Sequence, residues 1–213
     1  MDKPRLLDLF CGAGGAAMGY SRAGFEVVGV DINPQPHYPF RFILADALTY
    51  PIEGYVAIHA SPPCQSYTRK RSSWGRERTN FIEHPDLLAV TRDKLLSSKL
   101  PYVIENVEGS PIKSQVMLCG SMFKLNIHKH RYFESNKLLG DVPGECSRSV
   151  FLYNPWSGPG RTIAKFREAQ GTPWIPMAGG ASRKRGITGD LYNAIPPAYT
   201  EWIGGRIMRV LNG

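Results

Sequence analysis

Short apolar runs alternate with glycine-rich turns and helical segments along the first half of the chain. The runs are 5–10 (RLLDLF), 25–34 (FEVVGVDINP), 40–50 (FRFILADALTY), 55–64 (YVAIHASPPC) and 101–109 (PYVIENVEG), and each predicts a strand. Helical spacing follows the glycine cluster at 11–24 and recurs at 84–100 and at 195–211. Strands that alternate with helices predict an α/β fold with a doubly wound, mostly parallel sheet.

Glycines or polar residues follow the carboxyl end of each predicted strand. They are Gly12 and Gly14, Asp31, Asp46, Cys64 and Glu105. Ligands of parallel sheets bind at that edge, so we expect these residues to share one site.

The chain changes character near residue 134. Residues 134–188 are rich in Gly, Pro and Ser and predict a small irregular or β-rich appendage. Residues 189–213 predict a helix that returns to the main sheet, which leaves 1–133 as the main domain.

Composition narrows the function classes. Among 213 residues, 26 Lys and Arg exceed 18 Asp and Glu, and the net charge of +8 favours a polyanionic partner. No apolar stretch has the length of a signal peptide or a membrane span, so we expect a cytoplasmic protein with no membrane partner.

Cysteine and histidine spacing does not predict a metal. The four cysteines show no CxxC pair, which indicates free thiols rather than a zinc knuckle or a disulfide scaffold. His128 and His130 form an HKH element, but no third ligand lies at a recognisable spacing. We therefore expect no metal.

The glycine turn resembles a dinucleotide fingerprint. Gly12-x-Gly14-x-x-Ala17 fits the pattern, and Asp31 lies 19 residues beyond Gly12, where an acid can hold ribose hydroxyls. Nicotinamide, flavin and adenosyl-methionine enzymes all use such turns, and a purely structural turn is also open.

Cys64 and Glu105 are candidates for covalent chemistry. Pro62 and Pro63 restrict the backbone before Cys64, and the basic stretch that begins at Arg69 could lower the pKa of its thiol. Glu105 could share a proton with a substrate ring from a dry pocket. The alternatives are a buried structural cysteine and a carboxylate that caps its strand.

Six sequence blocks resemble, in order, the motifs of the cytosine-C5 DNA methyltransferases. They are DLFCGAGG, GVDINP, SPPCQS, IENV, HRYFES and NAIPPAYTEWIG. The resemblance implies a Rossmann-like methyltransferase fold, S-adenosyl-methionine as cofactor, and a flipped-out cytosine as substrate. It also implies that 1–133 is catalytic and cofactor-binding and that 134–188 is a small target-recognition region.

The resemblance assigns roles to individual positions. The implied cofactor residues are Phe10, Gly12, Gly14, Asp31, Ile32, Asp46 and Asn193, and the implied catalytic residues are Cys64, its support Pro63, Glu105, Arg131 and Lys129. The family pattern has arginine at Lys129, glutamine at Ile127 and glycine at Tyr192, and the lysine keeps the charge of the arginine but lacks its planar guanidinium.

Two basic clusters fit phosphate contacts to double-stranded DNA. They contain Arg69, Lys70, Arg71, Arg76 and Arg78 in the first and Arg183, Lys184 and Arg185 in the second. Candidates for base reading are Arg148, Tyr153, Asn154, Trp156, Arg161 and Arg167.

The sequence thus predicts a monomeric DNA (cytosine-5-)-methyltransferase. A transfer RNA methyltransferase, a catalytically silent DNA-binding relative and a nicotinamide oxidoreductase stay open as alternatives. A restriction-modification role, a stand-alone role and a phage-encoded role in a host cytoplasm stay open as well.

Overall fold

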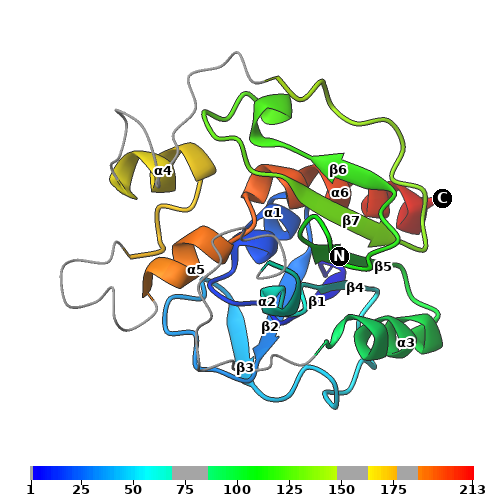
Figure 1. Cartoon of the computed structure of the whole chain (residues 1–213). Helices are drawn as coiled ribbons and strands as arrows, with labels where there is room; N and C mark the ends of the chain where they lie inside the picture. Colours follow the sequence, from blue (N-terminus) through cyan, green and yellow to red (C-terminus); the bar gives the residue numbers. More distant parts are fainter. Residues whose placement is uncertain (1, 69–85, 148–162, 177–186) are drawn as a thin grey trace.

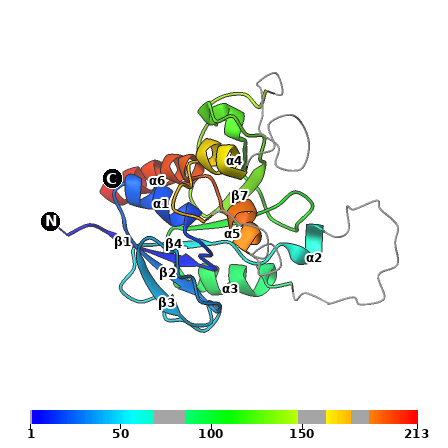
Figure 2. The same ribbon diagram turned by 90° about the vertical axis from the view of Figure 1, so that its left-hand side faces the viewer.

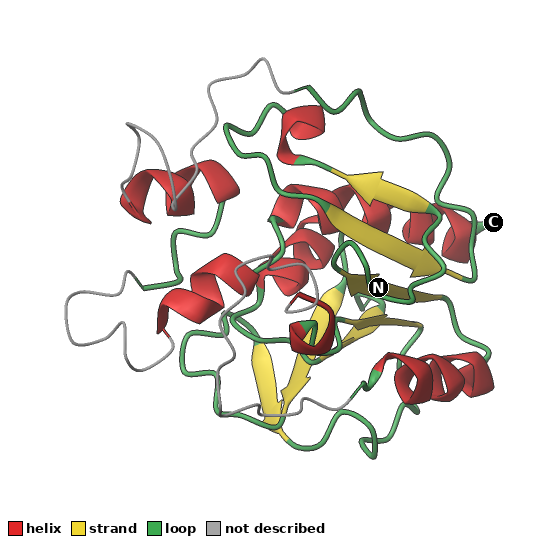
Figure 3. Ribbon diagram, viewed as in Figure 1, coloured by secondary structure: helices red, strands yellow, loops and turns green. Residues whose placement is uncertain are grey.

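The computed structural model describes residues 2–68, 86–147, 163–176 and 187–213. Its centre is a seven-stranded sheet of order β3-β2-β1-β4-β5-β7-β6 (Figures 1 and 3). The strands are β1 Arg5–Leu9, β2 Glu26–Asp31, β3 Arg41–Leu44, β4 Ala57–Ala60, β5 Tyr102–Asn106, β6 Val116–Leu118 and β7 Arg131–Ser135. The first five strands pair in parallel, and β7 runs antiparallel to both β5 and β6.

Helices cover both faces of this sheet. The helices of the described residues are α1 Gly15–Arg22, α2 Gln65–Thr68, α3 Leu88–Ser98, α4 Ile163–Gln170, α5 Ile187–Asn193 and α6 Pro197–Asn212, with a 3₁₀ turn at Gly120–Phe123. Figure 2 shows α1 and α6 on one side of the sheet and α3 on the other. The doubly wound α/β class predicted from the sequence is confirmed.

Alternate residues of the strands face the two helix layers. Leu6, Val27, Ala57 and Val103 join one buried cluster with residues of α1 and α6. Their neighbours Leu7, Val28, Ile58 and Ile104 join a second cluster with Leu95 of α3. Because side chains alternate across a strand, a run that is apolar throughout is buried on both faces. This explains why these runs are continuously apolar rather than alternating.

Helix α6 packs closely on α1. Gly19 of α1 and Gly204 of α6 lie in the contact, where an added Cβ would overlap Thr200 and Ala23, respectively. The Thr200 hydroxyl donates a hydrogen bond to the Ala16 carbonyl across the two helices at 2.9 Å. Small residues therefore bring the C-terminal helix against the first helix of the sheet.

The structure departs from the sequence reading in region 134–188. Strand β7 crosses the predicted boundary at 133/134, and the described part of the region holds a helix, α4, where the prediction was irregular or β-rich. Phe166 and Gln170 are the buried residues of α4. An eight-residue helix between Gly- and Pro-rich stretches is too short to give a clear period, which is why it was missed. The division into three segments stays a prediction.

The helices of the described residues are all too short or too polar to cross a bilayer.

Candidate active site

A cavity of about 330 Å³ opens at the carboxyl edge of the parallel strands. Of the cofactor residues implied by the resemblance, it is lined by Phe10, Gly12, Asp31, Ile32, Asp46 and Asn193, and of the catalytic ones by Pro63, Cys64, Glu105 and Arg131. Gly14 and Lys129 are not among the lining residues in the part of the chain described. The structure thus brings into one space residues at the carboxyl ends of the five parallel strands, at the start of β7 and in α5.

The glycine turn between β1 and α1 is fixed by Asp31. Phe10, Gly12 and Gly14 all have positive φ, at 57°, 47° and 82°. The Gly12 amide donates to Asp31 Oδ2 at 3.1 Å, and the Asn33 amide donates to Asp31 Oδ1 at 2.9 Å. Left-handed backbone is strained at Phe10, a cost typical of functional turns.

Gly14 has a packing role instead of lining the cavity. A Cβ at this position would lie 2.6 Å from Pro39 Cδ and 3.0 Å from Tyr38 Cδ2. Glycine is therefore required by close contact as well as by its φ of 82°.

Ile32 and Asp46 stand at the ends of the next two strands. Ile32 is 67 % exposed, which is unusual for an apolar side chain beside a cavity and suits a ligand with a flat apolar face. Asp46 Oδ1 accepts a hydrogen bond from the Leu48 amide at 2.8 Å, which fixes the turn that presents it.

Asn106, whose role the sequence analysis missed, positions the segment that carries Cys64. Its Nδ2 donates to the Pro62 carbonyl at 3.1 Å, and its Oδ1 accepts from the Val107 amide at 2.9 Å. Asn106 is 1 % exposed at the end of β5. The signal was a polar residue inside a strand predicted to be buried, where an amide needs partners.

The pKa of the Cys64 thiol is raised, which corrects the expectation of a lowered one. Burial and the nearby Glu105 carboxylate raise this pKa, and together they outweigh Arg131 and Lys129, which lower it. The basic stretch from Arg69 lies outside the described residues. Cys64 is therefore held as a thiol by its described surroundings.

Glu105 and Arg131 form an ion pair across β5 and β7. Arg131 Nε lies 2.9 Å from Glu105 Oε1, and both side chains are largely buried. The contact lacks hydrogen-bond geometry, so Oε1 has no hydrogen-bond partner within the described residues. Burial raises the pKa of Glu105 in spite of Arg131, Lys129 and a hydrogen bond from Ser61, which lower it. A neutral carboxyl can donate its proton to a ligand.

A buried hydrogen-bond chain lies behind Glu105. Tyr20 OH lies 3.0 Å from His59 Nδ1, and His59 Nε2 lies 2.8 Å from Ser61 Oγ. Burial lowers the pKa of His59 to about 3, so its ring is neutral at physiological pH. The chain fixes the Ser61 hydroxyl that bonds Glu105.

Lys129 is buried and does not line the cavity. Its Nζ donates to Gln170 Oε1 at 2.6 Å, to the Tyr192 carbonyl at 2.7 Å and to the Ala194 carbonyl at 2.6 Å. Burial and the nearby Arg131 lower its pKa. Lys129 thus joins β7 to α4 and α5, and its predicted catalytic role stays a prediction.

Two cysteines lie beside the histidines of the HKH element, and the sequence did not indicate this. Cys119 and Cys146 lie beside His128 and His130, and the potential ligand atoms of all four are within 4.8 Å of one another. The expectation of no metal depended on the lack of a third ligand, and that premise is wrong. Packing places the cysteines there, and no regular spacing marks them in the sequence.

Other expected sites fall outside the described residues. They include the phosphate contacts Arg69, Lys70, Arg71, Arg76, Arg78, Arg183, Lys184 and Arg185, and the base-reading candidates Arg148, Tyr153, Asn154, Trp156 and Arg161. Arg167 is described, and it donates to the Ile175 carbonyl at 3.3 Å.

Solved structures share this arrangement of strands and helices. The Dnmt2 methyltransferase of S. pombe superposes with a TM-score of 0.64 at 14% sequence identity. The match covers 100% of this chain and 100% of that chain. The Entamoeba histolytica methyltransferase EhMeth superposes with a TM-score of 0.64 at 13% sequence identity. The match covers 99% of this chain and 99% of that chain. The chain has the fold of these methyltransferases. The fold class predicted from the sequence, the Rossmann-like methyltransferase fold, is therefore confirmed.

A third structure differs in length. It is a proposed DNA modification methyltransferase encoded within an E. coli prophage, with 19% sequence identity and a TM-score of 0.46. The match covers 61% of this chain and 45% of that chain. No protein-family model and no curated protein sequence matches the chain.

Proposed function

We propose that this protein transfers a methyl group from S-adenosyl-methionine to C5 of a cytosine flipped out of double-stranded DNA. The observation that carries the proposal is the single cavity lined by both the glycine turn with Asp31 and the trio Cys64, Glu105 and Arg131. An oxidoreductase would leave that trio without a use, and a silent binding module would have no need of it.

The residues at one end of the cavity fit the methyl donor. At Gly12 an added Cβ would meet nothing within 4 Å, so its backbone borders open space. Asp31 would hold ribose hydroxyls with its remaining lone pairs, Asp46 would accept from the adenine amine, and Phe10 and Ile32 would flank the ring. When bound, the cofactor supplies an electrophilic methyl group on a sulfonium.

Cys64 and Glu105 would act on the pyrimidine. The Cys64 sulfur, as a thiolate, forms a bond to C6 and pushes an electron pair towards C5, which becomes the nucleophile for the methyl group. A protonated Glu105 donates to N3 and stabilises the added negative charge, and Arg131 orients the base. Methyl transfer leaves S-adenosyl-homocysteine as the product of the donor. The C5 proton then passes to water, and its electron pair forms the C5–C6 double bond. The S–C6 bond breaks to regenerate the Cys64 thiolate, and the proton on N3 returns to Glu105.

The raised pKa of Glu105 also bears on Cys64. The Glu105 carboxylate is one cause of the raised pKa of the thiol, and protonation of Glu105 removes that charge. The Arg131 and Lys129 cations then act on Cys64 without opposition from a carboxylate. A neutral Glu105 therefore serves both the base and the nucleophile.

The rigid segment before Cys64 limits where its sulfur can lie. Pro62 and Pro63 restrict the backbone, and Asn106 holds the Pro62 carbonyl. A displacement of about 1 Å at a reacting atom can cost on the order of 100-fold in rate. Asn106 is therefore a positioning residue in this proposal.

The test uses the full chain with labelled methyl donor and two substrates, duplex DNA and transfer RNA, in parallel. We expect transfer to duplex DNA and its loss, by more than about 1000-fold, in Cys64→Ser, because the covalent step needs the thiolate. Calorimetry should show nearly unchanged cofactor binding by this variant. If the methyl group is transferred to transfer RNA and not to duplex DNA, the substrate is RNA and the proposal of a DNA substrate is wrong.

A trapping experiment identifies the nucleophile. Oligonucleotides with 5-fluorocytosine cannot lose a C5 proton, so the Cys64 adduct should persist. Peptide mapping should place it on Cys64 and not on Cys11, the other cysteine that lines the cavity. Full activity of Cys64→Ser, or an adduct on another residue, would contradict the mechanism.

A further inference from the structure

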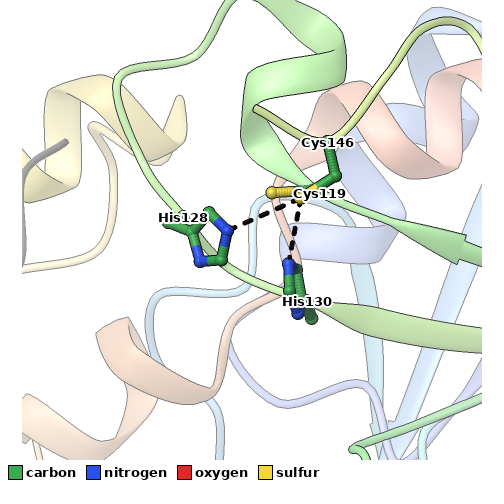
Figure 4. Close-up of side chains that lie close together, drawn as sticks. All are labelled: Cys119, His128, His130 and Cys146. Carbon is green, nitrogen blue, oxygen red and sulfur yellow. Dashed lines mark hydrogen bonds between the residues drawn. The ribbon is translucent and has the colours of Figure 1, made fainter. Parts of the chain in front are cut away.

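A cluster of two cysteines and two histidines lies beside the β6–β7 pair, and none of these four residues lines the cavity. Cys119 follows β6, His128 and His130 precede β7, and Cys146 comes from the segment after β7. Figure 4 shows the four side chains pointing towards one another. His130 Nε2 lies 3.3 Å and His128 Nε2 3.5 Å from Cys146 Sγ, and all four potential ligand atoms lie within 4.8 Å of one another.

These distances fit a tetrahedral metal site. Zinc bound at 2.0–2.1 Å to nitrogen and 2.3 Å to sulfur separates its ligand atoms by about 3.3–3.8 Å. The two observed nitrogen–sulfur distances lie in this range, and the other pairs, all within 4.8 Å, require shifts of at most about 1.5 Å. Two thiolates and two imidazoles form a donor set typical of structural zinc.

The surroundings of Cys119 supply a hydrogen bond to its sulfur. Ser121 Oγ donates to Cys119 Sγ at 3.4 Å, and the Ser147 amide donates to Ser121 Oγ at 3.1 Å. A donor of this kind stabilises a metal-bound thiolate and fixes its direction. The same contacts tie the backbone after Cys146 to the turn after Cys119.

Residues 128–131 alternate between the cluster and contacts with other parts of the protein. His128 and His130 face the cluster, whereas Lys129 bonds to α4 and α5 residues and Arg131 pairs with Glu105. Whatever fixes the two histidines therefore also fixes the backbone that presents Lys129 and Arg131. The four protein ligands leave no open position, which indicates a structural role and not a catalytic one.

We propose that Cys119, His128, His130 and Cys146 bind one zinc ion, which cross-links the segment after β7 to the β6–β7 pair and fixes the strand that carries Arg131. This proposal does not depend on the proposed methyl transfer. The zinc site would be present in this protein whichever reaction it catalyses.

The test measures metal on the full chain, purified with a histidine-free tag and without chelators from cells grown with zinc. Inductively coupled plasma mass spectrometry should find one zinc per chain. Cys146→Ser should reduce this content to near zero, because a site with three ligands binds zinc much more weakly. Cys64→Ser is the matched control and should keep one zinc, since it removes a cysteine outside the cluster.

A second measurement uses the unaltered protein, so that a poorly folding variant leaves the test intact. After zinc removal, added Co²⁺ should give the intense visible bands and thiolate charge transfer of tetrahedral cobalt. Zinc removal should also lower the melting temperature, and added zinc should restore it. A metal-free purified chain that gives no such cobalt spectrum, or a Cys119–Cys146 disulfide found by non-reducing peptide mapping, would overturn the proposal.

Discussion

At the scale of single residues, Lys129 shows how a charge in a catalytic motif can serve the structure. The ammonium group has three donors, and three acceptors on α4, on α5 and after α5 surround it at 2.6–2.7 Å. Each donor has a partner, which is the condition for keeping a charge buried. Lys129 thereby holds α5, which carries the cavity residue Asn193, against the strand that carries Arg131.

Lys129→Met should therefore act mainly on stability. The substitution removes all three hydrogen bonds that the buried Lys129 ammonium donates, and we expect a loss of about 3 kcal/mol in the free energy of unfolding. Chemical denaturation measures this. Lys113→Met, at an exposed lysine, is the control and should change stability by less than about 0.5 kcal/mol. A Lys129→Met variant of normal stability but without activity would instead indicate a direct catalytic role.

At the scale of elements, the contact between α1 and α6 offers two adjacent glycines in different surroundings. A Cβ at Gly204 would lie 2.7 Å from Ala23 Cβ and 3.1 Å from Tyr20 Cδ1, whereas a Cβ at Gly205 would meet nothing within 4 Å. Both lie in the interior of α6 and have the same cost in helix propensity.

The matched pair Gly204→Ala and Gly205→Ala should thus differ in stability. Gly205→Ala should stabilise the protein by up to about 1 kcal/mol through helix propensity. Gly204→Ala gains the same propensity but overpacks the helix contact, and we expect it to be less stable than Gly205→Ala by about 1–3 kcal/mol. Thermal or chemical unfolding compares the two. Equal stabilisation of both would show that α1 and α6 do not pack closely in solution.

At the scale of the whole molecule, Asp8 links stability to pH. It is fully buried on β1, where Tyr38 OH donates to its Oδ2 at 3.3 Å, while Oδ1 has no hydrogen-bond partner in the described ranges. Burial, with a smaller contribution from Asp31, raises its pKa to about 8, although the Tyr38 hydrogen bond lowers it.

Between pH 4 and pH 8 the folded protein therefore keeps a proton on Asp8 that the unfolded chain has released. The folded state binds more protons, so this group makes the free energy of unfolding fall as the pH rises. The fall over the whole interval is on the order of 5 kcal/mol. His59, with a pKa lowered to about 3, has the opposite effect, which is complete above its ordinary pKa of 6.5.

Asp8→Asn should remove the Asp8 contribution. The difference in the free energy of unfolding, Asp8→Asn minus unaltered protein, should increase by several kcal/mol from pH 5 to pH 8. Urea denaturation at each pH measures it. Asp93→Asn, at an exposed aspartate of α3, is the control and should show a constant difference. A constant difference for Asp8→Asn as well would mean that Asp8 is ionised in the folded protein.

Much of the fold could be predicted from the sequence because its signals are local. Five apolar runs marked five strands, and their last residues marked the edge where the cavity opens. Strand β7 and helices α4 and α5 gave weaker signals because polar residues interrupt their apolar positions, and β6 did so because it has only three residues. Asp31 was found because it follows a predicted strand 19 residues beyond Gly12 of the glycine turn, and Cys64 was found because two prolines restrict the backbone before it.

The sequence by itself determined the order of strands and helices and the chemistry available at the carboxyl edge of the sheet. The tertiary structure alone decided that Gly14 and Lys129 do not line that cavity, that Asn106 holds the Pro62 carbonyl, and that Cys119 and Cys146 join two histidines elsewhere. The reason is that apolar periodicity and turn residues act over a few neighbours, and contacts between distant segments depend on how the whole core packs.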